Sequence, residues 1–261
     1  MAAYGWDPRI HNYRNLDTGK IVAEKTVVGY RDQLRLSTEG RMRQLATDAA
    51  NGSISAADFS IAMRNELRSS YSVHYMLALG GREQMGAADW GRVGNMLRGQ
   101  YGFLDGFVAD VSNGRYEDSP GGAAARASLY AASLTQAFER GVVASYGMPT
   151  LPAYPGDGTT VCKSRCHCHW RIEELAAGDW NVYWVIDTAV ENCSTCQQRT
   201  LDWSPLKIRG GVVRNTELAG SIAITAQQIQ QLLNSHPHEA TNGHHSHRYG
   251  IPQPVYERHL G

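Results

Sequence analysis

The sequence predicts an α+β protein in which an N-terminal helical bundle-like domain precedes a small cysteine-rich β module, with extended segments at both termini. Three observations support this fold class. Amphipathic patterns of helical period fill residues 21–148, a segment rich in proline and glycine follows, and all five cysteines then fall between positions 162 and 196.

The composition is that of a folded protein without a dominant charge. Hydrophobic residues make up 42% of the 261-residue chain, and 25 basic residues balance 25 acidic ones. A chain with no net charge has no overall field that attracts nucleic acid or an anionic membrane. No apolar run approaches the ~20 residues of a membrane helix, and the first residues lack the features of a secretory signal. We therefore expect a protein that matures in the cytoplasm without membrane contact.

The N-terminal residues predict an extended arm followed by a long helix. Residues 1–20 are polar and include Pro8 and Gly19, which disfavour a regular helix. From residue 21 the apolar positions adopt a helical period, and Asn51-Gly52 ends the pattern. The 27 glycines of the chain predict many turns, close helix contacts, or both.

Three further helices are predicted before residue 148. Ser55 with Asp58 resembles a capping box and starts the second, which ends at Gly80-Gly81. The third shows the clearest stripe of apolar residues at helical spacing: Trp90, Val93, Leu97, Tyr101, Leu104, Val108 and Val111. A loop at 120–122 precedes a fourth helix over 123–146. Four amphipathic helices with short connections predict a bundle-like domain over 21–148.

The composition changes at residues 148–158, which hold three prolines and two glycines, so a domain boundary is predicted there. The β module is predicted over 149–224. Its strands are expected over 166–172 and 181–186, with a turn at Gly178-Asp179 and one or two short strands within 207–224. Residues 225–261 are expected to form a short helix and an extended tail rich in histidine.

The five cysteines predict a metal site in the β module. They form two groups with the spacings C-x3-C-x-C and C-x2-C, at Cys162, Cys166, Cys168, Cys193 and Cys196. Four thiolates around one zinc ion are typical of small structural modules, and C-x2-C is the usual spacing of two ligands in one turn. Cys193 and Cys196 are the firmest candidates, and two of the other three complete a set of four. His167 and His169 are weaker candidates, because strand alternation points them away from Cys166 and Cys168.

Two alternatives to a structural zinc remain open at the level of the sequence. The cysteines form disulfides or stay free and buried, but a reducing cytoplasm and an odd number of thiols favour a metal. A catalytic metal is less favoured, because such a site keeps an open position beside an acid-base group. The part of the module between residues 154 and 206 has only about 50 residues and is too small to rely on its own core, so a structural metal suits it.

Motifs around the cysteines resemble those of tailed-phage minor capsid and head morphogenesis proteins, a group loosely similar to the Mu F-like family. The resemblance covers residues 21–206 and is most specific at Tyr154-Pro-Gly-Asp-Gly-Thr-Thr-Val-Cys162, Cys166-His-Cys168-His-Trp170, Cys193-Ser-Thr-Cys196-Gln-Gln-Arg199 and Trp203-Ser-Pro205. In the Mu F-like pattern a His-Pro-x-Cys-x-Cys element commonly follows the C-x2-C pair. Here the C-x-C element comes first, and Ser164-Arg165 replaces His-Pro.

The resemblance implies a virion structural protein associated with the capsid, portal or neck. Such a protein is assembled in the host cytoplasm, is present in multiple copies in a symmetric assembly, and acts by protein–protein contacts, not as an enzyme. His74 is interpreted as a core or interface histidine and Asp157 as a turn former. Motifs of serine hydrolases, zinc proteases and phosphate-binding loops are absent from the sequence.

A zinc-ribbon protein that binds nucleic acid or takes part in DNA packaging is the alternative. Basic side chains around the module would then contact phosphate: Arg165, Arg171, Arg199, Lys207, Arg209 and Arg214. The zero net charge instead favours a solvated face for these residues.

Overall fold

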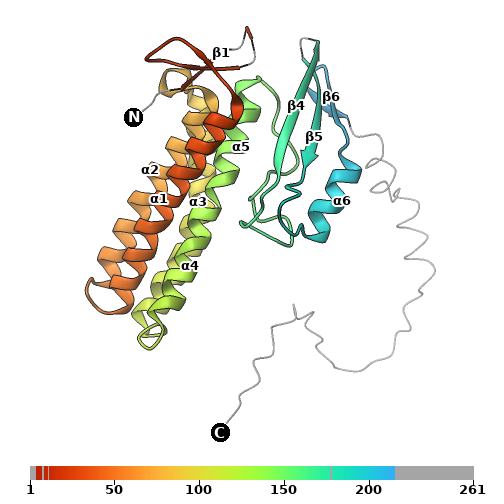
Figure 1. The fold of residues 1–261 in the computed structure, drawn as a ribbon. Helices are drawn as coiled ribbons and strands as arrows, with labels where there is room; N and C mark the ends of the chain where they lie inside the picture. The colour runs from red at the N-terminus through yellow and green to blue at the C-terminus, as the bar shows by residue number, and fades with distance from the viewer. Residues whose placement is uncertain (1–3, 8, 11, 177, 215–261) are drawn as a thin grey trace, which may run out of the picture. The chain divides into compact units, whose positions relative to one another are not determined.

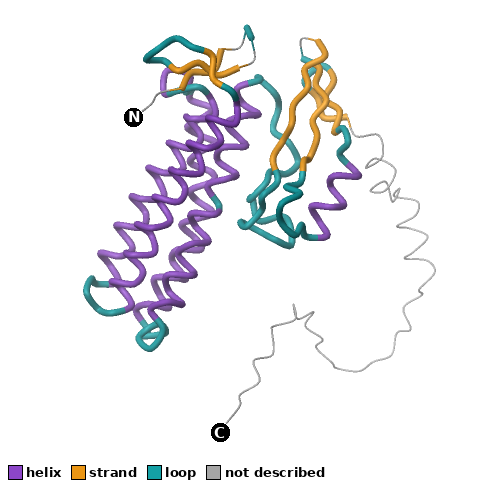
Figure 2. Tube along the Cα trace, in the orientation of Figure 1, coloured by secondary structure: helices purple, strands orange, loops and turns teal. Residues whose placement is uncertain are grey.

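The computed structural model describes residues 4–7, 9–10, 12–176 and 178–214, and it combines a helical domain with a small antiparallel sheet (Figures 1 and 2). The elements, in chain order, are β1 (Tyr4–Asp7), β2 (Asn12–Asn15), β3 (Ile21–Val22), α1 (Glu24–Ala50), α2 (Ala56–Leu79), η1 (Arg82–Gln84), α3 (Ala87–Ser112), α4 (Pro120–Ala132), α5 (Leu134–Ser145), β4 (His169–Ala176), β5 (Asp179–Val185), α6 (Ser194–Asp202), β6 (Leu206–Arg209) and β7 (Val212–Arg214). The α+β prediction is confirmed. Among the described residues, none of the helices is both long and apolar enough to cross a membrane.

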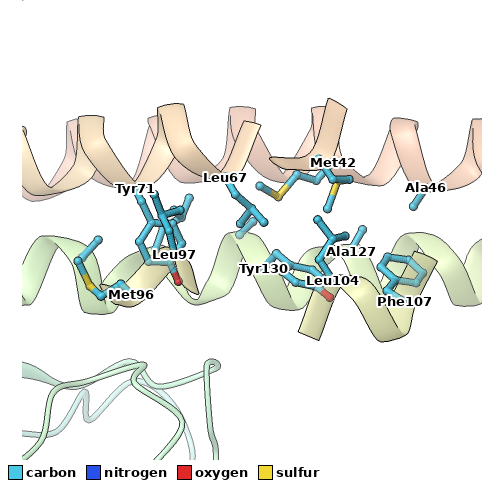
Figure 3. Close-up of a cluster of buried hydrophobic side chains, with 14 of the residues drawn as sticks. Met42, Ala46, Leu67, Tyr71, Met96, Leu97, Leu104, Phe107, Ala127 and Tyr130 are labelled. Atoms are coloured by element: carbon cyan, nitrogen blue, oxygen red, sulfur yellow. The ribbon is translucent and has the colours of Figure 1, made fainter. Parts of the chain in front are cut away.

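The helical domain is a bundle in which α1 packs against α4, and α2 packs against both α3 and α5. Its core is a continuous cluster of buried side chains between the helices (Figure 3). Phe107 is fully buried in this cluster, edge-to-face with Phe59 and stacked on Tyr130, at centroid distances of 5.2 and 6.1 Å. The aromatic and methionine side chains of the predicted helical stripes therefore serve mainly to fill this core.

Two glycines are required by close approaches of the backbone. Gly80 ends α2 with φ +99°, as the Gly pair predicted, and an added Cβ would clash with the Trp6 backbone nitrogen. Gly141 brings α5 against α2, because its Cβ would lie 2.6 Å from the carbonyl oxygen of Tyr75. The predicted capping box is also present in part, since the Ser55 hydroxyl accepts the Asp58 backbone N–H.

The predicted fourth helix is instead two helices, α4 and α5, separated at Ser133. The Ser133 hydroxyl donates to the Tyr130 carbonyl at 2.6 Å and lies 2.7 Å from the buried Tyr71 hydroxyl. A serine that bonds to the preceding turn competes with regular helix geometry. The predicted loop at 120–122 is part of α4, where Pro120 takes a first-turn position that needs no N–H donor.

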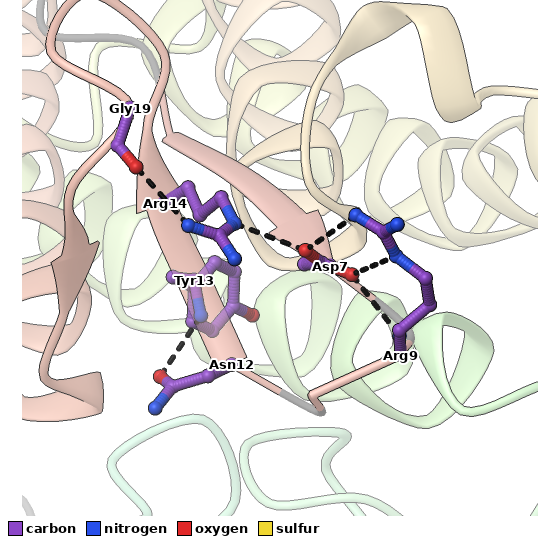
Figure 4. A network of polar contacts seen from close by, with 6 residues as sticks. All are labelled: Asp7, Arg9, Asn12, Tyr13, Arg14 and Gly19. Atoms are coloured by element: carbon purple, nitrogen blue, oxygen red, sulfur yellow. Dashed lines mark hydrogen bonds and ion pairs between the residues drawn. The ribbon is translucent and has the colours of Figure 1, made fainter.

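The N-terminal residues form a small sheet and not the extended arm that was predicted. β1, β2 and β3 pair antiparallel, and the buried Tyr13 donates its hydroxyl to the Ala78 carbonyl of α2 at 2.7 Å. Hydrogen bonds from Arg9 and Arg14 hold the Asp7 carboxylate, and they keep its pKa well below the usual range (Figure 4). The arm prediction failed because the polar residues between the aromatic ones obscured a short alternating pattern.

The cysteine-rich module holds the second sheet, in the order β4-β5-β6-β7 with antiparallel pairing throughout. The predicted turn is confirmed, since Gly178 has φ +83° between β4 and β5. The first strand begins later than predicted, at His169, so Cys166 and Cys168 lie in the preceding loop. The predicted strand residues at 215–224, the last helix and the histidine-rich tail fall outside the described residues.

Candidate metal centre

Two segments that are far apart in the sequence carry the five cysteines. The loop before β4 presents Cys162, Cys166 and Cys168, while Cys193 is the N-terminal cap of α6 and Cys196 lies in its first turn. Asp157 shapes the start of the loop, because its carboxylate accepts the backbone N–H groups of Tyr154 and Thr159 at 2.7 and 2.9 Å. The turn-forming role predicted for Asp157 is thus confirmed.

All five thiols gather around Cys196. One group joins it to Cys162 and Cys193, the other joins it to Cys166 and Cys168, and within each group the sulfur atoms lie within 4.8 Å of one another. The Sγ of Cys196 is 3.8 Å from that of Cys162 and 3.6 Å from that of Cys166. Zinc–sulfur bonds of ~2.3 Å in a tetrahedron place the sulfur atoms about 3.8 Å apart. Each group of three therefore has the spacing of three corners of a tetrahedral thiolate site, and Cys196 is common to both groups.

The electrostatic environment of the thiols divides them into two kinds. Hydrogen bonds, first from the Cys168 thiol and then from backbone N–H groups, lower the pKa of Cys166 to about 5 against the opposing effect of burial. Burial also opposes ionisation of Cys193, but the backbone N–H groups of Cys196 and Cys162 lower its pKa to about 7. The pKa values of the other three are raised, by burial for Cys162 and Cys196 and by hydrogen bonding to Cys166 for Cys168. A cation that binds here displaces the remaining protons.

The histidines of the module stand apart from the thiol cluster. His167 and His169 are exposed, and the two groups of potential metal ligands found in the described part of the chain contain only cysteine. His74 lies elsewhere, buried in α2, where its Nδ1 bonds to the Ser70 carbonyl at 2.8 Å and burial lowers its pKa to about 4. Its assignment as a core histidine is confirmed.

A group of tryptophans supports the cysteine cluster. The ring centroids of Trp170, Trp184 and Trp203 lie 5.0–5.7 Å from one another. The Arg199 guanidinium lies over two of these rings, 4.9 Å from the centroid of Trp184 and 5.1 Å from that of Trp203. Arg199 also donates to the Thr159 hydroxyl at 3.0 Å, which ties α6 to the cysteine loop. Sequence analysis assigned Arg199 to a basic surface and treated residues 193–196 as a turn. The signal for α6 was the spacing of Cys196, Arg199 and Trp203 by three and four residues, which is helical.

A buried carboxylate connects the module to the helical domain. The Oε2 of Glu139, in α5, accepts the backbone N–H of Trp170 at 2.9 Å, and its Oε1 lies 3.8 Å from the guanidinium of Arg31 in α1. Burial is the largest influence and raises the pKa of Glu139 to about 7, although the Trp170 N–H and Arg31 act in the opposite direction. Sequence analysis missed this residue because its partners lie 31 and 108 positions away.

Replacing Glu139 by glutamine is expected to remove a pH-dependent part of the stability. A carboxyl with a raised pKa binds its proton more tightly in the folded state than in the unfolded state. The protonated Glu139 side chain therefore contributes fully to the stability of the folded protein below pH 4.5, its ordinary pKa. This contribution is lost as the pH rises from 4.5 to about 7. As the pH rises across this window, the free energy of unfolding of the variant should therefore increase relative to that of wild type, by about 2–3 kcal/mol in total. Urea unfolding of both proteins between pH 5.5 and 8 measures the difference, and parallel curves would contradict the assignment.

Comparisons with known proteins add no relationship, since no family model, curated protein or solved structure matches the chain.

Proposed function

We propose that this protein is a structural component of a tailed-phage virion, bound near the capsid, portal or neck, and that a structural zinc ion holds its C-terminal module together. The observation that carries the proposal is the cysteine cluster, in which two segments whose motifs resemble those of phage head proteins meet around Cys196. Its role is assembly by protein–protein contacts, not catalysis.

The donor set supports zinc as the ion and a structural role for it. Both ligand groups consist of sulfur alone, which zinc accepts readily in closed tetrahedral sites. Cys193 and Cys196, with Cys166 and either Cys162 or Cys168, would supply four thiolates. Bound zinc would join the cysteine loop to α6 and so hold the small sheet in place. This cross-link stabilises a module whose buried core is dominated by tryptophans and a few aliphatic residues.

The solvent face of α3 supports a role in protein contacts. Gly91, Gly94, Gly99 and Gly102 are exposed there, and an added Cβ at any of them would meet no described atom within 4 Å. Each glycine in a helix costs ~0.5–1 kcal/mol relative to alanine, and packing inside this chain does not require it. Trp90 and Phe103 on the same helix are 44% and 68% exposed. Burial of these two side chains against a partner would remove their apolar surface from water.

Incorporation into virus particles tests the proposal directly. The chain should be co-expressed with the capsid and portal proteins of its own phage, and the particles then separated by density-gradient sedimentation. We expect the chain to sediment with the particles, and the Cys193→Ser variant to be lost from them. A monomer that stays at the top of the gradient in every combination would overturn the proposal.

Nucleic-acid binding by the sheet is the alternative function, and it rests on Arg171, Lys207 and Arg214, which are exposed in β4, β6 and β7. The Arg171 guanidinium also lies 4.3 Å over the Tyr183 ring, and two other members of the basic set are engaged within the protein. Arg199 lies over two tryptophans, and Arg209 donates to the Trp180 carbonyl and the Asn181 side chain. If DNA is the ligand, its retention should fall with salt and with an Arg165→Ala substitution.

A further inference from the structure

A groove of about 1270 Å³ runs between β4 with its preceding loop and the helices α1, α4 and α5. We name it the β4 groove. Apolar side chains line part of it, among them Val28, Leu36, Phe138, Val142 and Ile172. Its volume exceeds the ~300–1,000 Å³ typical of sites for small molecules. A groove of this size and mixed lining has room for a polypeptide segment.

One edge of β4 faces this groove. Strand β4 is the outermost strand of its sheet, and its other edge pairs with β5. Because the Trp170 N–H points away from β5 to Glu139, the alternation of an antiparallel ladder makes Ile172 point its N–H and C=O the same way. Trp170 and Ile172 both line the groove. The first of these outward N–H groups, that of Trp170, already donates to the Glu139 carboxylate. A hydrogen-bond acceptor can therefore reach this edge of the strand.

The charges around the groove leave an excess of cations. On the helical side, the Asp32, Glu39 and Glu139 carboxylates are paired with Arg31, Arg35 and Arg43. On the side of the module, the loop and β4 contribute Arg165, His167, His169 and Arg171. Arg165 and Arg171 form no ion pair with the described residues, although the Arg171 guanidinium lies 4.3 Å over the Tyr183 ring. Lys25 is a third cation of the lining outside these ion pairs, and Glu24 and Asp187 are the remaining carboxylates, so the cations exceed the carboxylates by one. An occupant that carries negative side chains complements this wall.

We propose that the β4 groove receives an extended acidic peptide segment of another virion subunit, which pairs with the outer edge of β4 at Ile172 as a further strand. Strand addition supplies backbone hydrogen bonds at Ile172, while alternate acidic side chains reach Arg165 and Arg171. An exposed sheet edge is a template for such pairing, and proteins that do not use it usually cover or blunt it. The inference rests on the proposed function, because it names the kind of contact through which the protein assembles.

A short acidic peptide provides the probe for this groove. We would measure fluorescence anisotropy of a labelled ten-residue peptide that alternates glutamate with threonine, using the full chain purified with its metal. Binding is expected to weaken at least tenfold in Ile172→Pro, because proline removes the outward N–H and is tolerated at a strand edge. Ile172→Val keeps the N–H and should bind normally. Arg171→Glu should weaken binding several-fold, whereas Arg98→Glu on the exposed face of α3 should not.

Each other outcome decides against the inference. Failure of the acidic peptide to bind, or binding that Ile172→Pro leaves unchanged in a folded variant, would overturn it. Tighter binding of a ten-nucleotide oligothymidylate than of the peptide would assign the groove to nucleic acid instead. Particle sedimentation separates this result from the proposed function: wild-type chain in the particles without peptide binding removes only the groove inference, whereas its absence from them removes the virion role.

Discussion

Replacing Cys196 by serine is expected to abolish metal binding and unfold the β module, while the helical domain stays folded. Cys196 belongs to both sulfur groups, so its loss leaves no group of three close thiols among the described residues. A structural zinc contributes on the order of 10 kcal/mol to a module of this size, which has too small a core to fold alone. Elemental analysis should find about one zinc per wild-type chain and none in the variant, and tryptophan fluorescence should report the loss of the Trp170–Trp184–Trp203 cluster.

Single serine substitutions at Cys162 and Cys168 are the matched controls. A tetrahedral site needs four of the five thiols, so one of these two changes should leave the zinc content and the module intact. A chelator should unfold the wild-type module in the same way as Cys196→Ser and leave the far-ultraviolet signal of the helices. A chain that contains no zinc and unfolds identically with and without chelator would show that the thiols act only as buried core residues.

Replacing Gly91, Gly94, Gly99 and Gly102 together by alanine is expected to raise the free energy of unfolding of the isolated chain by about 2–4 kcal/mol. All four lie in the exposed interior of α3 with open space around them, so alanine gains helix propensity without a clash. The same variant should enter particles less well, because the added methyl groups would separate α3 from a closely packed partner. Urea unfolding and particle sedimentation measure the two effects.

Gly141→Ala is the control for this prediction. It introduces the same methyl group into a helix, but the new Cβ would lie 2.6 Å from the Tyr75 carbonyl oxygen and 2.7 Å from the Ala78 Cβ. Overpacking of this kind costs about 1–3 kcal/mol, so this variant should be less stable than wild type. Stabilisation by both substitutions would mean that α2 and α5 do not approach as closely as the structure indicates.

Local patterns in the sequence were enough to predict most of the helical domain and the identity of the candidate ligands. The first three helices lie within a few residues of their predicted bounds, because apolar spacing and caps such as Ser55 and Gly80 act over one or two turns. The cysteine spacings likewise predicted a common site for Cys162, Cys166, Cys168, Cys193 and Cys196. Two short groups of thiols within one small module are expected to meet, because the module offers them few other binding partners.

Contacts between distant segments decided the rest, and no local pattern reports them. Pairing of β1 with β2 and packing of Tyr13 on α2 turned a polar arm into a sheet, and the bond of Ser133 to Tyr71 accompanies the break between α4 and α5. The arrangement of all five thiols around Cys196 needs α6 to meet the cysteine loop. The β4 groove is lined by segments that are distant in the sequence, and the bond between Glu139 and the Trp170 N–H joins the edge of the sheet to the helices there. The sequence determined which groups are available for chemistry, and tertiary packing determined which of them meet, because their energies of contact depend on distance in space.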